Sequence, residues 1–154
     1  MVDYSAYVEA QTCRYRSFES KKRHWRNGQA RYVSRAMKRL DRSANILDIA
    51  CGDGVGLAMM KKMGFRSLTG VDLCAEKMQI AQQRGFDVRV GDMHDLGFLD
   101  EKTFGIVYTS HSLEHCYAPK LALQELRRVL EPGGLLLVVI PFPDTGPDDA
   151  HCGK

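Results

Sequence analysis

From residue 45 onward, short apolar runs alternate with amphipathic segments, and this alternation constrains the fold more than any other feature of the chain. Five apolar runs predict strands over residues 46–50, 67–72, 87–90, 104–109 and 135–140. The spacing of apolar residues predicts helices over 57–63, 75–84 and 120–130. Such βαβ units place helices on both faces of a parallel sheet. We therefore expect an α/β fold with a doubly wound, mostly parallel sheet of about five strands. The last strand is almost wholly apolar and is expected to be buried on both faces.

The two ends of the chain differ from this alternating region. Residues 3–42 carry two apolar helical faces and predict a pair of helices with a turn near Asn27-Gly28. Residues 144–154 are rich in Pro, Gly and Asp and predict an irregular tail. We expect a basic N-terminal helical segment over 1–44, an α/β domain over 45–143 and the tail over 144–154.

Charge is distributed unevenly along the chain. Residues 1–44 hold 11 Lys or Arg against 4 Asp or Glu, whereas the remaining residues hold 11 against 15. A basic segment can bind nucleic acid or another anionic partner, but a run of charge is more often a solvated helix face. The sequence leaves both interpretations open for the N-terminal segment.

The cysteines and the hydropathy bear on the compartment. The five cysteines are odd in number and scattered, without a CxxC pair, which favours reduced thiols in a cytoplasmic protein. No apolar run reaches the roughly 18 residues that a membrane span needs. The N-terminus shows no signal-peptide pattern. We expect a cytoplasmic protein that does not interact with membranes.

A glycine-rich loop follows the first predicted strand, in the run Asp48-Ile-Ala-Cys-Gly52-Asp-Gly54-Val-Gly56. Glycine lets the backbone turn sharply and approach a ligand closely, although many such clusters are only tight turns. Asp72 ends the second predicted strand, where a carboxylate can accept hydrogen bonds from ribose hydroxyls. An acid at that place can also stabilise the start of the next helix. Together the loop and Asp72 predict a nucleoside site outside the carboxyl ends of the strands.

The spacing of the glycines disfavours a dinucleotide. In the dinucleotide fingerprint GxGxxG, counted from Gly52, Leu57 takes the place of the third glycine. Asp53 adds negative charge where a pyrophosphate would approach. S-adenosylmethionine has no phosphate and carries a sulfonium and an ammonium group, which a nearby carboxylate such as Asp48 can suit. An NAD-dependent oxidoreductase is therefore the weaker interpretation.

Five motifs in order resemble those of class I S-adenosylmethionine-dependent methyltransferases, closest to their type 11 group. They are Asn45-Ile-Leu-Asp-Ile-Ala-Cys-Gly-Asp-Gly, Gly70-Val-Asp-Leu, Val90-Gly-Asp-Met-His-Asp-Leu, Phe104-Gly-Ile-Val-Tyr-Thr-Ser-His-Ser-Leu-Glu-His and Leu126-Arg-Arg-Val-Leu-Glu-Pro-Gly-Gly-Leu. The resemblance covers about residues 45–143. It implies a Rossmann-like fold and a methyltransferase that takes S-adenosylmethionine, releases S-adenosylhomocysteine and acts on an acceptor that we expect to be a small molecule.

The resemblance also assigns residues to the cofactor. It implies that Asp72 holds the ribose, with Leu73 against the adenine, and that Asp92 bonds the adenine amino group. Met93 would lie on the adenine ring, with packing in the core as the alternative. The complete implied set of cofactor contacts is Asp48, Ala50, Cys51, Gly52, Gly54, Asp72, Leu73, Asp92, Met93, Ser110 and His111.

Two histidines are candidates for acid–base catalysis. His111 and His115 follow the fourth predicted strand, and histidine is easily tuned near neutral pH. Either could act as a base if the acceptor must lose a proton, and His115 could instead be structural. With Cys116 they could approach a metal ion, but no fourth ligand is evident, so we expect no metal.

The C-terminal part departs from the resemblance. Only 14 residues follow Ile140, too few for the helix and the two strands, 6 and 7, with which the family fold normally continues. We expect the fifth strand to be an edge, covered by the N-terminal helices or by a second copy in a homodimer. A non-catalytic binding module, or a truncated methyltransferase completed by a partner, is the alternative to an active enzyme.

Overall fold

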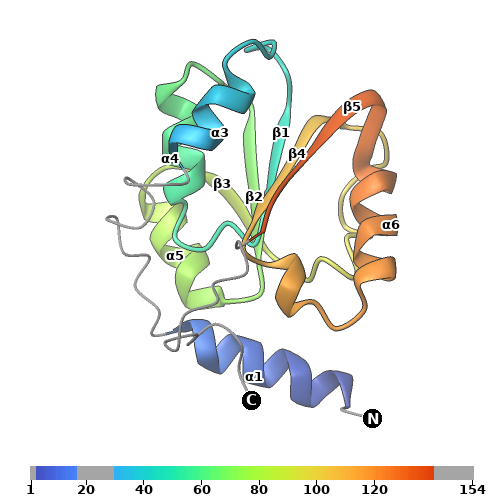
Figure 1. The fold of residues 1–154 in the computed structure, drawn as a ribbon. Helices are drawn as coiled ribbons and strands as arrows, with labels where there is room; N and C mark the ends of the chain where they lie inside the picture. Colours follow the sequence, from blue (N-terminus) through green and yellow to red (C-terminus); the bar gives the residue numbers. More distant parts are fainter. Residues whose placement is uncertain (1–2, 17–29, 141–154) are drawn as a thin grey trace, which may run out of the picture.

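The computed structural model describes residues 3–16 and 30–140, and its sheet has the predicted architecture. The strands are β1 (Ile46–Ile49), β2 (Leu68–Asp72), β3 (Asp87–Val90), β4 (Phe104–Ser110) and β5 (Leu130–Val139). They form one sheet in the order β3-β2-β1-β4-β5, and every neighbouring pair is parallel (Figure 1). The predicted α/β, Rossmann-like fold is confirmed.

Helices cover both faces of this sheet, as the βαβ pattern requires. The helices are α1 (Tyr4–Arg16), α3 (Ala30–Met37), α4 (Val55–Lys62), α5 (Ala75–Gln83) and α6 (Pro119–Val129), with a short 3-10 turn, η2 (Leu113–His115). Helices α3, α4 and α5 lie on one side of the sheet and α6 on the other (Figure 1). No helix within residues 3–16 and 30–140 has both the length and the apolar character needed to cross a bilayer.

Alternate residues of the central strands supply the two sides of the core. Leu47, Ile49 and Val107 pack with Leu126 and Val129 of α6 on one face. Ile46, Ile106 and Tyr108 alternate with these residues along the same strands and point to the opposite face. There they form a cluster with Val33 and Met37 of α3, Met60 of α4 and Phe65. This period of two fixes which side chains point into each layer, so only the strand ends remain open for a ligand.

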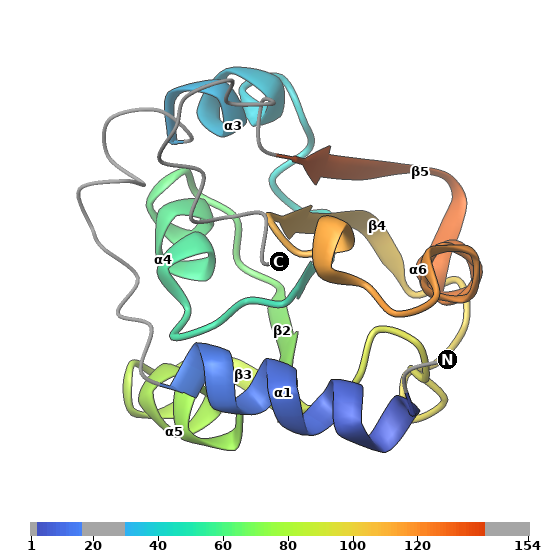
Figure 2. The same ribbon diagram turned by 60° about the horizontal axis from the view of Figure 1, so that its bottom comes forward.

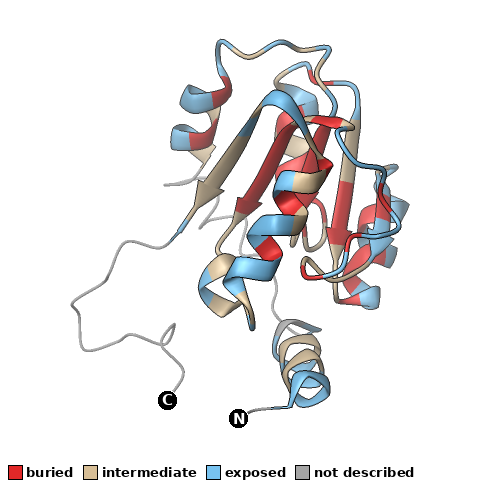
Figure 3. Cartoon of the chain, turned by 90° about the vertical axis from the view of Figure 1, so that its right-hand side faces the viewer, coloured by how far each residue is buried: buried red, intermediate tan, exposed pale blue. Residues whose placement is uncertain are grey.

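The prediction that the fifth strand is buried on both faces is wrong. Strand β5 begins at Leu130, five residues before the predicted start, and its side chains are half-buried or exposed. Figure 3 shows the strand in tan and pale blue beside the red β4. The reason is its position, because β5 pairs with β4 alone and ends the sheet. Its apolar residues are only partly buried, with Leu136 packed against the core on one face and Leu137 and Val139 packed against it on the other.

The N-terminal helices take places that the sequence did not indicate. The helical prediction fails over residues 38–42, which form turns, and the expected turn near Asn27-Gly28 lies outside the described residues, as does the tail. Helix α3 buries Val33 and Met37 in the core of one sheet face, so it covers that face and not the free edge of β5. Helix α1 lies across the carboxyl ends of the strands (Figure 2).

Candidate functional site

The loop after β1 is shaped by three residues in the left-handed region. Ala50, Gly52 and Gly54 have φ values of 58°, 54° and 82°. This region is strained for alanine, and strained backbone that the surrounding fold maintains is often found at ligand sites. Gly54 precedes the first turn of α4 without a side-chain cap, and its N–H donates to the Cys51 carbonyl. The loop thus turns tightly at the carboxyl edge of the sheet, as its glycines predict.

Asp72 joins this loop to the end of β2. Its Oδ2 accepts from the N–H of Gly52 at 2.9 Å, and its Oδ1 accepts from the N–H of Cys74 at 2.8 Å. Burial raises the pKa of Asp72, while the two N–H donors act in the opposite direction. Each carboxylate oxygen keeps lone-pair capacity beyond these bonds. Asp72 is therefore fixed as an acceptor, with the half-buried Leu73 next to it in the chain.

Asp48 lies deeper, beneath the start of α4. Its side chain is buried, and a Cβ placed on Gly56 would lie 2.6 Å from its Oδ2, so only glycine lets the helix approach it this closely. Burial, and then the charge of Asp72, raise the pKa of Asp48. A charged carboxylate here is costly, which makes a cationic neighbour favourable.

The side chains of two residues in the β1 loop, Cys51 and Asp53, make contacts that the sequence did not predict. The Cys51 side chain packs in a core cluster with Leu57 and Met78, which leaves its backbone for any cofactor contact. Asp53 makes an ion pair with Arg84 at 3.1 Å, while its Oδ1 is buried without a hydrogen-bond partner. Arg84 offsets the negative charge of Asp53. Asp53 would therefore repel a pyrophosphate less than the sequence alone predicts.

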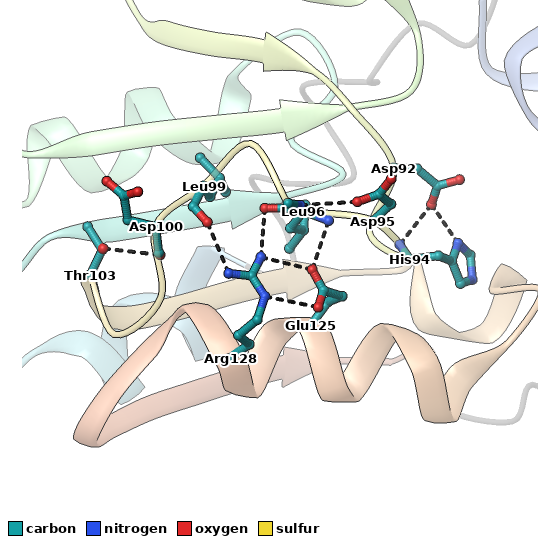
Figure 4. A network of polar contacts seen from close by, with 10 residues as sticks. Asp92, His94, Asp95, Leu96, Leu99, Asp100, Thr103, Glu125 and Arg128 are labelled. Atoms are coloured by element: carbon teal, nitrogen blue, oxygen red, sulfur yellow. Dashed lines mark hydrogen bonds and ion pairs between the residues drawn. The ribbon is translucent and has the colours of Figure 1, made fainter.

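The loop after β3 carries Asp92 and is bound to α6. Arg128 donates to the carbonyls of Leu96 at 2.7 Å and Leu99 at 3.0 Å, and it pairs with Glu125. Glu125 in turn accepts from the N–H of Leu96 at 2.9 Å (Figure 4). Met93 packs partly against the core beside this network, which agrees with the packing alternative for that residue. The network fixes the loop, and so fixes the position of Asp92.

Asp92 is already engaged from two directions. Its Oδ1 accepts from the His94 N–H at 2.9 Å and faces His94 Nδ1 at 2.5 Å (Figure 4). Its Oδ2 accepts from the hydroxyl of Tyr4 on α1. The carboxylate expected at the adenine therefore lies at the carboxyl edge, in contact with the N-terminal helix.

The end of β4 completes the edge. His111 has a φ of 53°, and its N–H donates to the Val139 carbonyl at 2.8 Å. Ser110 Oγ lies 3.0 Å from His111 Nδ1. His115 lies on η2, with its Nε2 4.0 Å from Glu114. Within the described part of the chain, no group of three or more His, Cys, Asp or Glu could hold a metal ion.

The structure also brings in residues that the sequence analysis missed. Tyr4 and Tyr7 of α1 pack with His94 and Tyr117, with ring centroids 5.3 to 6.0 Å apart. Cys116 Sγ lies 3.0 Å from His94 Nε2. No local spacing in the sequence connects these residues, because they come from three separate segments that meet only in the fold.

The structure thus places the predicted site residues toward one edge of the sheet, near the carboxyl ends of β1, β2 and β4 and in the loops that follow β1 to β4. Comparison with known families finds a match over residues 47–138 to a family described as "Methyltransferase domain". The chain belongs to this methyltransferase family. The match covers all five strands of the sheet except the start of β1 and the end of β5.

Curated relatives agree with the methyltransferase assignment. The domain is 38% identical over 96 residues to "Probable phthiotriol/phenolphthiotriol dimycocerosates methyltransferase 2" of Mycobacterium ulcerans, covering 58% of this chain and 36% of that protein. It is 32% identical over 114 residues to a ubiquinone biosynthesis O-methyltransferase of Xanthomonas oryzae, covering 70% of this chain and 46% of that protein. The chain therefore spans less than half the length of these two relatives.

Solved structures share the fold of the methyltransferase domain. The cyclase SpnF superposes with a TM-score of 0.67 at 27% identity, covering 74% of this chain and 45% of that chain. Geranyl diphosphate C-methyltransferase of Streptomyces coelicolor, solved with S-adenosyl-L-homocysteine, gives 0.66 at 18% identity, covering 75% and 46%. S-adenosylmethionine is the cofactor of this family, and the chain fits it. The Asp72 carboxylate, held by two backbone N–H groups, is a hydrogen-bond acceptor of the kind that ribose hydroxyls require, and it lies beside a loop with glycines at its turns.

Proposed function

We propose that this domain transfers a methyl group from S-adenosylmethionine to a small-molecule acceptor. The observation that carries the proposal is the Asp72 carboxylate, which two backbone N–H groups hold between the β1 loop and the start of α5. The two curated relatives are named for phthiotriol/phenolphthiotriol dimycocerosates and for ubiquinone biosynthesis, which supports a small-molecule acceptor.

In this proposal, each strand end has a separate role. Asp72 accepts hydrogen bonds from the ribose hydroxyls, with Leu73 beside the adenine. Asp92 accepts a hydrogen bond from the adenine amino group. Because its Oδ2 already accepts from the Tyr4 hydroxyl, the adenine either shares the carboxylate with Tyr4 or displaces it. The backbone turn formed by Ala50, Gly52 and Gly54 lies along the methionine part of S-adenosylmethionine.

When bound, S-adenosylmethionine supplies an already activated methyl group, so the protein contributes mainly by orienting the acceptor. Ser110, the last residue of β4, and His111, which follows it, lie where we place the methyl group and the acceptor. His111, with His115 as the alternative, takes a proton where the acceptor must lose one. The left-handed backbone of His111 fixes where its side chain leaves the strand.

The remaining partners are weaker proposals. Much of the basic N-terminal charge, including Lys21, Lys22, Arg23 and Arg26, lies outside the described residues, and Arg16 pairs with Glu76 at 2.8 Å. A nucleic-acid interaction and a homodimer at β5 have no support beyond the sequence. The non-catalytic alternative is not favoured, because the family and the two curated relatives are named as methyltransferases.

The proposal is tested with S-adenosylmethionine labelled in its methyl group and a cell extract as the source of acceptors. We expect the label to enter the organic-soluble, low-molecular-weight fraction with the wild-type protein but not with Asp72→Ala. Asp100→Ala, which removes an exposed carboxylate elsewhere, is the matched control. Label found only in precipitated nucleic acid or protein, or equal transfer by the two variants, would contradict the proposal. Since one structural neighbour is a cyclase, cofactor binding without any label transfer would indicate a different reaction at the same site.

A further inference from the structure

Cys116, His94 and Asp92 form a chain of polar contacts, of which the proposed methyl transfer uses only Asp92. Cys116 Sγ lies 3.0 Å from His94 Nε2, and His94 Nδ1 lies 2.5 Å from Asp92 Oδ1. The order is thiol, imidazole and carboxylate, each within hydrogen-bond reach of the next. A nucleophile, a base and a group that orients the base make up the arrangement that activates a nucleophile in enzymes.

The hydrogen bonds define the protonation of the histidine. The N–H of Ala118 donates to His94 Nε2 at 3.2 Å, so this nitrogen is an acceptor and the ring proton lies on Nδ1, toward Asp92. His94 is buried at 5% exposure, and Tyr4 and Tyr7 pack against its ring. The ring is therefore held in one orientation, with its basic nitrogen facing the sulfur.

We propose that Cys116 is a base-assisted nucleophilic thiol and a site of oxidation by hydroperoxides, with His94 as its proton acceptor and Asp92 as the positioning residue. In the reaction, Sγ attacks one oxygen of hydrogen peroxide, so that an S–O bond forms and the O–O bond breaks. The sulfur is oxidised to a sulfenic acid and the peroxide is reduced. The thiol proton passes to His94 Nε2 and then to the departing hydroxide, which leaves as water.

The surroundings favour assisted attack over a resting thiolate. Burial raises the pKa of the Cys116 thiol, and the Ala118 N–H acts in the opposite direction, so the resting sulfur keeps its proton. During attack, His94 becomes an imidazolium that Asp92 stabilises, and the Ala118 N–H can donate to the sulfur that loses its proton. Reactivity therefore depends on the folded contact with His94, and not on exposure.

Cys13 offers a matched control within the same molecule, because it is exposed on α1 whereas Cys116 is only partly accessible. The reduced protein is treated at pH 7 with hydrogen peroxide and dimedone, which traps sulfenic acids, and each cysteine is followed by peptide mass spectrometry. We expect Cys116 to be trapped faster than Cys13. His94→Gln should slow trapping at Cys116 by roughly 100-fold, the usual contribution of a general base, and leave Cys13 unchanged.

A second measurement does not depend on whether the variant folds. Unfolding wild-type protein in urea exposes Cys116 but removes its contact with His94, so its trapping rate should fall to that of Cys13. Trapping at Cys116 that is no faster than at Cys13 in the folded protein, or that rises on unfolding, would overturn the proposal. So would an unchanged rate at Cys116 in a folded His94→Gln protein. Neither experiment needs S-adenosylmethionine, and their outcome is independent of the proposed methyl transfer.

Discussion

Replacing Arg128 by methionine should loosen the loop that carries Asp92. Methionine keeps the apolar stem of the side chain but removes the donors to the Leu96 and Leu99 carbonyls. A hydrogen bond from a charged donor contributes about 1.5–3 kcal/mol. Because 31% of the Arg128 side chain is exposed, we take the lower value for each, and the ion pair with Glu125 adds at most about 1 kcal/mol. We therefore expect Arg128→Met to lower the free energy of unfolding by roughly 3 kcal/mol.

Urea unfolding measures this loss, with Arg127→Met as the control because Arg127 is the exposed neighbour on the same helix. Hydrogen exchange should also accelerate at the Leu96 N–H, which donates to Glu125. The effect has a defined pH dependence. Arg128 lowers the pKa of Glu125, so the stabilisation is present above the usual Glu pKa of about 4.3 and is lost as pH falls through the lowered value. If the two variants unfold at the same urea concentration, Arg128 does not fix the loop.

Two further changes test the buried acid beneath α4. Gly56→Ala gains about 1 kcal/mol of helix propensity but places a Cβ 2.6 Å from Asp48 Oδ2, so we expect a net loss of about 1–2 kcal/mol in urea unfolding. The loss should disappear in an Asp48→Ala background, and its persistence there would show that the contact is not the cause. Asp48→Asn addresses the charge: because burial raises the pKa of Asp48, its favourable contribution is complete below the usual Asp pKa of about 3.9 and is lost as pH rises through the raised value. The stability of Asp48→Asn relative to wild type should therefore increase as the pH rises above about 4, and a constant difference would count against a raised pKa.

The sheet could be predicted from the sequence because its determinants are local. Apolar runs, helical spacing and glycines after helices each act over a few residues, and the predicted third strand coincides with β3. The turn at Gly64, with a φ of 97°, follows α4 as a left-handed C-terminal glycine should. Asp72 and the β1 loop could be placed together because parallel strands end at one edge.

Other features depend on contacts between distant segments, which no local pattern carries. The missing strands 6 and 7 already predicted that the fifth strand is an edge, but an apolar run such as 135–140 does not show how far helices cover its two faces, so its partial exposure could not be predicted. The contact of Tyr4 with Asp92 spans 88 residues, and that of His94 with Cys116 spans 22. Likewise, Arg84 forms an ion pair with Asp53 and offsets the negative charge that the sequence places near the cofactor.

The central claim is that the Asp72 carboxylate, held by the Gly52 and Cys74 N–H groups, binds the ribose of the cofactor. Isothermal titration calorimetry with S-adenosylhomocysteine tests it most directly, on wild-type protein, Asp72→Ala and Asp100→Ala, each checked for cooperative thermal unfolding. We expect wild type and Asp100→Ala to bind with equal affinity. Asp72→Ala should bind at least about tenfold more weakly, since each hydrogen bond to a charged acceptor contributes about 1.5–3 kcal/mol. Equal affinity of a folded Asp72→Ala, or no binding heat with wild type, would contradict the claim.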